Sequence, residues 1–177
     1  MDATASPSLT LHMLRQRYLA HADRHYRRRS GEPTGEAANM EDAINRFIDF
    51  AGGGGKLGSR INQHQVRAWV DQLAQEELSR TYVNQCLSRV RRWVRWCCDW
   101  DLIPFSITED LRRVRPLARF RSKAKESRRT PPPSIDTIEK VVAQMRAPAR
   151  DVLQLVKLTG ARPSEILALT NGEVFLD

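Results

Sequence analysis

The residues with the clearest capacity for chemistry lie near the end of the chain, in the stretch Leu-Thr-Gly-Ala-Arg-Pro-Ser-Glu at positions 158–165. Gly160 permits a sharp turn, and Pro163 suits the first position of a helix. Arg162 therefore precedes a helix start, where unpaired backbone N–H groups favour an anion. A guanidinium at this position can hold a phosphate through two hydrogen bonds. The pattern indicates phosphate binding by Arg162, and the alternative is a structural ion pair between Arg162 and Glu165.

A second group of residues is suited to nucleic acid and lies on one arc of a helix expected at positions 81–100. This arc has no acidic residue between Glu77 and Asp99, so we expect nothing nearby to neutralise it. Arginines there can reach phosphates or guanine edges, and Asn84 or Gln85 suits adenine. The alternative is an ordinary solvated face, and Trp96 either packs on a neighbouring helix or lies exposed against DNA. The expected DNA contacts on this helix are Thr81, Asn84, Gln85, Ser88, Arg89, Arg91, Arg92 and Arg95.

Positive charge continues beyond this helix. Residues 89–129 hold thirteen Arg and Lys against five Asp and Glu, an excess equal to the net charge of +8 for the whole chain. The segment 114–133 shows little helical periodicity and ends in three consecutive prolines, which indicates a linker. We expect this basic linker to lie along DNA phosphates. Its expected contacts are Arg119, Arg121, Lys123 and Lys125.

Hydrophobic periodicity predicts the elements that position these residues. A first helix is expected at about residues 9–28, a second is carried by apolar residues within 40–51, and four glycines at 52–55 indicate a flexible loop. Asn62 and Gln65 offer a capping box for a third helix ending near Glu77, and Thr81 offers the N-cap of the fourth. Together they form a four-helix bundle. The expected core face of the fourth helix consists of Val83, Cys86, Leu87, Val90, Trp93, Val94, Cys97 and Trp100.

Further helices are expected after this bundle. A short one covers residues 108–114, and Ser134 caps another that follows the linker. A helix then precedes Gly160, a last one starts at Pro163, and residues 174–176 suit the beginning of a strand. The side chains expected to face inward in the helix after Ser134 are Ile135, Ile138, Val141, Val142 and Met145.

The composition limits the class of protein. The chain has 177 residues, 41% of them hydrophobic and 28% charged, which suffices for one moderate core or two small ones. Its positive charge favours a polyanionic partner. No apolar run approaches the roughly 20 residues that span a bilayer, and the start does not resemble a secretion signal. We therefore expect a cytoplasmic protein without a membrane segment, with reduced core cysteines and no metal.

The stretch around Arg162 resembles the first arginine box of the tyrosine recombinase, or phage integrase, family. Residues 81–96 followed by Leu102-Ile103-Pro104 look like the last long helix and exit of that family's core-binding domain, and residues 134–139 resemble the opening helix of its catalytic domain. The first 60 residues match only by helix pattern. The resemblance implies a mainly α chain: a SAM-like four-helix core-binding bundle at 1–113, a basic linker at 114–133, and the first helices of an integrase-type catalytic domain at 134–177.

The same resemblance implies a function. The chain would be the DNA-binding portion of a site-specific recombinase acting in DNA integration and recombination by strand exchange through a phosphotyrosine link, without a cofactor. Arg162 would bind the scissile phosphate with Glu165 in support. The partners would be double-stranded DNA and other recombinase protomers. The family's catalytic lysine, His-x-x-Arg box, second His or Trp and tyrosine nucleophile all follow the first arginine box and are not found here, so we expect this chain alone to be inactive.

Two alternatives to a recombinase remain. One is a DNA-binding regulator that occupies its sites without cutting. The other is a helical protein-interaction module whose basic face meets an acidic protein. Salt-dependent binding to duplex DNA separates the second from both DNA-binding functions.

Overall fold

The computed structural model describes residues 9–127, 130–170 and 172, and within them regular secondary structure is helical. The mainly α class expected from the sequence is therefore confirmed. The chain divides into two compact units, Met1–Arg128 and Arg129–Asp177, and each is described by itself. In the described residues no helix is long and apolar enough to cross a membrane.

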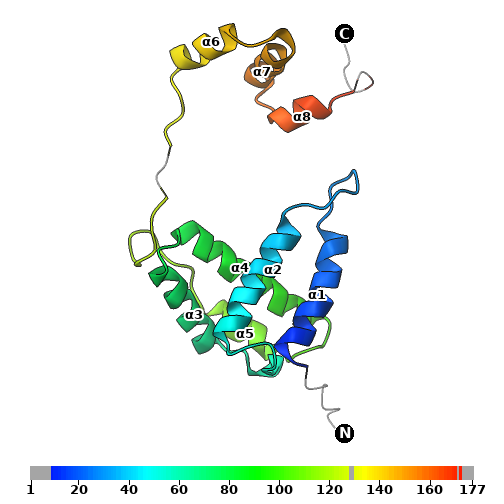
Figure 1. The fold of residues 1–177 in the computed structure, drawn as a ribbon, viewed down its shortest axis with the longest axis vertical. Coiled ribbons are helices and arrows are strands. Elements are labelled where there is room, and N and C mark those ends of the chain that lie inside the picture. Colours follow the sequence, from blue (N-terminus) through cyan, green and yellow to red (C-terminus); the bar gives the residue numbers. More distant parts are fainter. Residues whose placement is uncertain (1–8, 128–129, 171, 173–177) are drawn as a thin grey trace. The chain divides into compact units, whose positions relative to one another are not determined.

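The first unit is a helical bundle arranged around one long helix (Figure 1). Its elements are α1 (Leu11–His25), α2 (Glu36–Phe50), the short 3₁₀ helix η1 (Gly58–Arg60), α3 (Gln63–Gln75), α4 (Arg80–Asp99) and α5 (Ser106–Arg112). α4 contacts all four of the other α-helices in this unit. The exposed arc of α4 is therefore held in place by packing on several sides.

Polar side chains cap α1, α3 and α4, whereas α2 and α5 begin without a side-chain cap. Asn62 caps α3 as expected, and Thr10, which the sequence analysis did not name, caps α1; each accepts a hydrogen bond from a backbone N–H that lacks a partner within the helix. The N-cap expected at Thr81 was wrong. Ser79 takes that place, because its Oγ accepts from the backbone N of Tyr82 at 3.2 Å and α4 begins at residue 80. Thr81 is consequently exposed on the first turn of α4.

The apolar face of α4 forms the centre of the core. Its expected core side chains are buried except that of Trp100, which is 64% exposed at the helix end. Cys98, absent from the expected set, is buried instead and accepts a hydrogen bond from Thr108 Oγ1 at 3.1 Å. Cys98 lies against α5, which explains why a residue outside the predicted apolar face is buried at this end of α4. The largest side chains enclosed with this face include Tyr18, Phe47, Trp69 and Trp93.

The run of four glycines is tied to the start of α1. Gly54 O accepts from the backbone N of His12 at 2.9 Å, and Lys56 O accepts from that of Leu11 at 2.8 Å. The connection between α2 and η1 is thus a loop, as expected, and it satisfies the first N–H groups of another helix. Gly58 is buried, and a Cβ there would lie 2.2 Å from Leu14 Cδ1. Any larger residue at position 58 would therefore clash with the Leu14 side chain.

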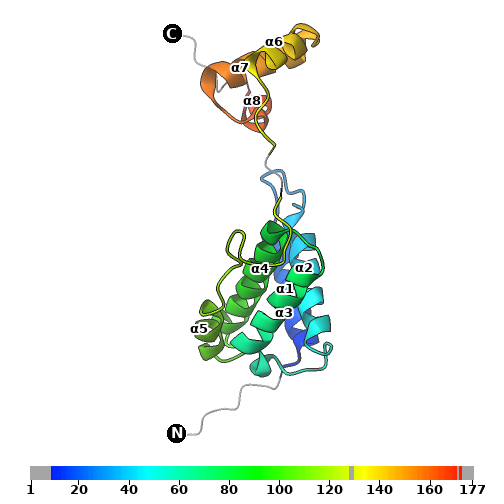
Figure 2. The same ribbon diagram turned by 90° about the vertical axis from the view of Figure 1, so that its left-hand side faces the viewer.

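The segment after α5 packs on the bundle, which departs from the expected linker. We call residues 115–126 the strap; it appears as the yellow-green loop beside the start of α4 in Figure 1 and again in Figure 2. Ala124 is buried, and Lys125 pairs with Ser79 in a parallel bridge. Residues 114–127 of the expected linker therefore belong to the first unit, and the short helix expected at 108–114 is α5.

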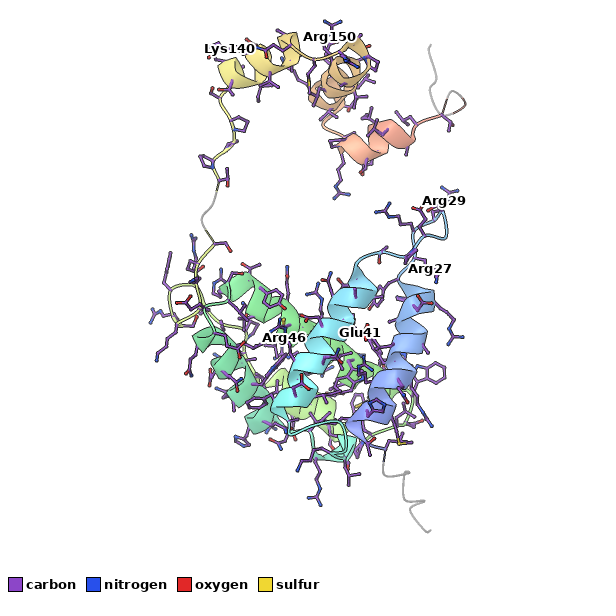
Figure 3. The ribbon with its side chains drawn as sticks, in the orientation of Figure 1. Arg27, Arg29, Glu41, Arg46, Lys140 and Arg150 are labelled. Carbon is purple, nitrogen blue, oxygen red and sulfur yellow. The ribbon has the colours of Figure 1, made fainter. Side chains whose placement is uncertain are left out.

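The second unit comprises α6 (Ile135–Ala143), α7 (Ala147–Thr159) and α8 (Pro163–Ala168). Ser134 caps α6 and Gly160 ends α7 with a φ of 68°, both as expected. No side chain of these three helices is buried, so the inward orientation expected for the apolar residues of α6 was wrong within this unit. Figure 3 labels Lys140 on α6, which pairs with Asp136 at 2.8 Å, and Arg150 on α7. The strand expected at 174–176 lies outside the described residues.

Candidate nucleic-acid interface

Six of the eight expected contacts on α4 line one open hollow. The hollow runs along the first half of α4 and is bordered on one side by Glu36 at the start of α2. Its lining combines guanidinium groups with the amide and hydroxyl groups that hydrogen-bond to bases and phosphates. Its other lining residues are Arg80, Thr81, Asn84, Gln85, Ser88, Arg89 and Arg92.

A second hollow continues this surface between α4 and α5. Ser88 and Arg92 border both hollows, so they form the ridge between them. Together the two hollows are lined by six different arginines and by one carboxylate, that of Glu36. The second hollow is lined by Ser88, Arg91, Arg92, Val94, Arg95, Thr108, Leu111 and Arg112. We call the surface formed by both the basic face.

Glu36 was missed by the sequence reasoning, and the expectation that nothing neutralises this arc was wrong. Its carboxylate accepts from Arg89 Nη2 and from Arg92 Nη1, each at 3.0 Å. The Arg89 hydrogen bonds, aided by the charge of Arg92, hold the pKa of the Glu36 carboxyl below its usual range. Arg92 remains half exposed, whereas Arg89 is largely covered. The first hollow therefore holds two guanidinium groups that converge on one acid.

Two further expected contacts have structural partners. Arg91 donates to the Leu111 carbonyl at the end of α5, and burial lowers the pKa of its guanidinium. Asn84 Nδ2 donates to the Leu117 carbonyl at 3.1 Å, and Leu117 N donates back to Asn84 Oδ1 at 2.8 Å. Asn84 thereby holds the strap against α4. Ser88, Gln85 and Arg95 remain exposed on the face itself.

The basic residues of the strap lie near the start of α4. Lys125 donates to Glu77 at 2.9 Å, and Arg80 holds Glu126 with an Nε–Oε1 distance of 2.8 Å. Arg119, Arg121 and Lys123 are exposed on the same loop. The strap therefore adjoins the basic face at Arg80, whereas Arg121 and Lys123 border a separate hollow beside Asp71 and Gln75 of α3.

Trp96 packs on α1 rather than lying free. Its ring is 5.3 Å from that of Tyr18, edge to face, and 5.3 Å from that of His21. Of the two interpretations of Trp96, packing on a neighbouring helix is therefore confirmed. The three cysteines are free and buried, and burial raises the pKa of Cys86 and of Cys97, which fits small core side chains.

Arg162 lies in the second unit at the N-cap of α8. Its backbone N–H donates to Glu165 Oε2 at 2.8 Å, and its Nη1 lies 3.4 Å from Oε1 of the same carboxylate. The structural ion pair considered as an alternative is therefore present, although the Arg162 side chain is exposed. An exposed pair of this kind contributes little to stability, so the guanidinium is accessible to an anion.

In the described part of the chain, no group of three or more His, Cys, Asp or Glu side chains is arranged to hold a metal ion. Comparisons of the sequence with protein-family models and with curated proteins, and of the fold with solved structures, gave no match.

Proposed function

We propose that the first unit binds double-stranded DNA through the basic face and the strap. One observation carries this proposal: hydrogen-bonding and cationic residues spread over about four turns of α4 line continuous hollows on a single face, with one carboxylate among six arginines. Solvated helices normally mix both signs of charge. A surface of this composition suits a regular array of phosphates, which interact with arginines while amides and hydroxyls meet base edges.

The exposed arginines define the phosphate contacts. Arg92 and Arg95 have side chains 49% and 57% exposed, one α-helical turn apart in sequence, and each has an acidic partner near its own edge of the face. A phosphate can replace those surface partners at small cost because exposed ion pairs are weak. Arg89 and Arg91 are more enclosed. They connect α4 to Glu36 and to the Leu111 carbonyl, and they add to the positive electrostatic potential of the basic face.

The finer proposal rests on the resemblance to tyrosine recombinases. In it the first unit is a core-binding domain, other recombinase protomers are partners on DNA, and Arg162 of the second unit binds the scissile phosphate with Glu165 in support. The exposed Arg162 guanidinium next to the start of α8 supports this role. The parent reaction would be strand exchange through a phosphotyrosine link.

The experiment places one negative charge on the ridge of the basic face. Ser88 is exposed and borders both hollows, and a glutamate there can pair with Arg92 four residues later, so Ser88→Glu should preserve α4. The matched control is Ser59→Glu, the same change at an exposed position of η1. Binding to duplex DNA is measured across a salt series.

We expect wild type and Ser59→Glu to bind duplex DNA with an affinity that falls steeply with salt. The slope of log affinity against log salt should be about −0.9 per phosphate neutralised. Ser88→Glu should bind at least about tenfold more weakly with a shallower slope. Equal binding by the two variants would show that DNA does not use this face. Salt-insensitive or absent binding by wild type would favour an acidic protein as the partner.

A further inference from the structure

A large aromatic side chain projects from the strap. Phe120 is 74% exposed at the turn of the loop, and its neighbours Arg119 and Arg121 are exposed as well. The guanidinium carbon of Arg119 lies 4.8 Å from the centre of the Phe120 ring. Lys123 adds a further exposed cation to the same loop. An exposed apolar ring thus lies against one guanidinium, on a loop that carries two further exposed cations.

The loop holds Phe120 in an unfavourable backbone conformation. Its φ is 56°, a left-handed value that bulky residues rarely adopt and that strains the backbone. The backbone N–H of Phe120 donates to Glu126 Oε1 at 3.1 Å, and the same carboxylate accepts from Arg80 Nε at the first turn of α4. The conformation is therefore braced by contacts that do not involve the ring.

The exposed ring has no role in stabilising the bundle. It belongs to neither the core nor the partly buried side chains packed against it, whereas Leu117 and Ala124 of the same strap do pack inward. A position that combines backbone strain, exposure of a large apolar side chain and a brace to α4 suits contact with a partner. Three exposed cations around it select a polyanion.

We propose that Phe120 is a wedge that inserts between two base pairs of duplex DNA while Arg119, Arg121 and Lys123 contact the flanking phosphates. This inference rests on the proposed DNA binding and adds how that DNA is deformed. Apolar side chains inserted at a base step unstack it and kink and unwind the duplex, and a ring braced at its backbone needs little rearrangement to do so. The Arg80–Glu126 contact connects the wedge to the basic face of α4.

The test measures unwinding on DNA of any sequence. Relaxed closed-circular plasmid is saturated with the full chain, treated with a topoisomerase that removes torsional strain, and stripped of protein before its topoisomers are separated. The variants are Phe120→Ala, Phe120→Leu and the control Phe105→Ala, which removes another exposed phenylalanine, 53% exposed and outside the strap. Binding of each variant to linear duplex is measured in parallel, so that topoisomers are compared at equal occupancy.

Wild type and Phe105→Ala should shift the topoisomer distribution, Phe120→Leu should retain part of the shift, and Phe120→Ala should lose most of it. Phe120→Ala should weaken binding by no more than about tenfold, because lost stacking is offset by the unstacking it no longer requires. If Phe120→Ala unwinds plasmid as wild type does, or if wild type binds without unwinding, the wedge is wrong and DNA binding stands. If wild type fails to bind linear duplex, the proposed function fails and the wedge with it.

Discussion

Replacing Asn84 with alanine should destabilise the first unit, because Asn84 connects α4 to the strap. The variant removes two hydrogen bonds, of 3.1 Å and 2.8 Å, to the backbone of Leu117. Each contributes about 0.5–1.5 kcal/mol net, and the unpaired peptide groups left behind add to the loss. Alanine returns roughly 0.5 kcal/mol through its higher helix propensity. We therefore expect a net loss of about 2 kcal/mol in the free energy of unfolding.

The measurement is urea unfolding followed by tryptophan fluorescence, which reports on the first unit because all four tryptophans lie within it. With a denaturant slope of about 2 kcal/mol per molar, the midpoint should fall by about 1 M while the slope stays constant. Gln85→Ala changes the exposed neighbouring residue and should leave the midpoint within about 0.25 M of wild type. If the two variants unfold alike, the Asn84–Leu117 pairing does not hold the strap and Asn84 is free to read bases.

Two further predictions concern the Glu36 carboxylate and the close packing of Gly58 against Leu14. Because Glu36 has a lower pKa in the folded chain than in the unfolded one, its stabilising effect is present above the ordinary carboxyl pKa and is lost as the pH falls through the folded value. Acid titration of stability should therefore show a shallower decline below about pH 5 for Glu36→Gln than for wild type, and equal declines would contradict the pairing. Gly58→Ala places a Cβ 2.2 Å from Leu14 Cδ1 and should lower the melting temperature by an amount equivalent to about 1–3 kcal/mol, whereas Gly55→Ala meets nothing within 4 Å and should be close to neutral.

Local signals were the reliable part of the sequence. Asn62 and Ser134 mark helix starts by accepting from the backbone N–H three residues later, and Pro163 marks one by its fixed φ, so their roles follow from nearby residues alone. The apolar face of α4 was equally accessible, because a 20-residue helix repeats its pattern over several turns. The cap of α4 was expected two residues too late, at Thr81 instead of Ser79, because both residue types are good caps and helix boundaries predicted from sequence vary by one or two residues.

Contacts between distant residues were beyond the sequence. Glu36 meets Arg89 from 53 positions earlier, and Asn84 meets Leu117 from 33 positions earlier. Neither contact can be predicted from the charges along the sequence, because the partner residues are far apart in the chain. The basic arc was thus located correctly, but its degree of neutralisation was not. The exposure of Phe120 has no signal in the sequence either, because a single aromatic residue in a loop can be buried or exposed.

The brace between the strap and α4 also bears on how the first unit opens. Near one end of the strap, Arg80 N donates to the Lys125 carbonyl at 2.8 Å and Lys125 N donates to the Leu78 carbonyl at 3.0 Å. Near the other end, Leu117 N donates to Asn84 Oδ1 at 2.8 Å. A segment held in this way exchanges its amide hydrogens and meets proteases only when the start of α4 opens with it. We therefore expect the strap and α4 to open as one cooperative unit. A ligand that binds the strap should then slow amide hydrogen exchange in α4, by an amount set by the free energy of binding.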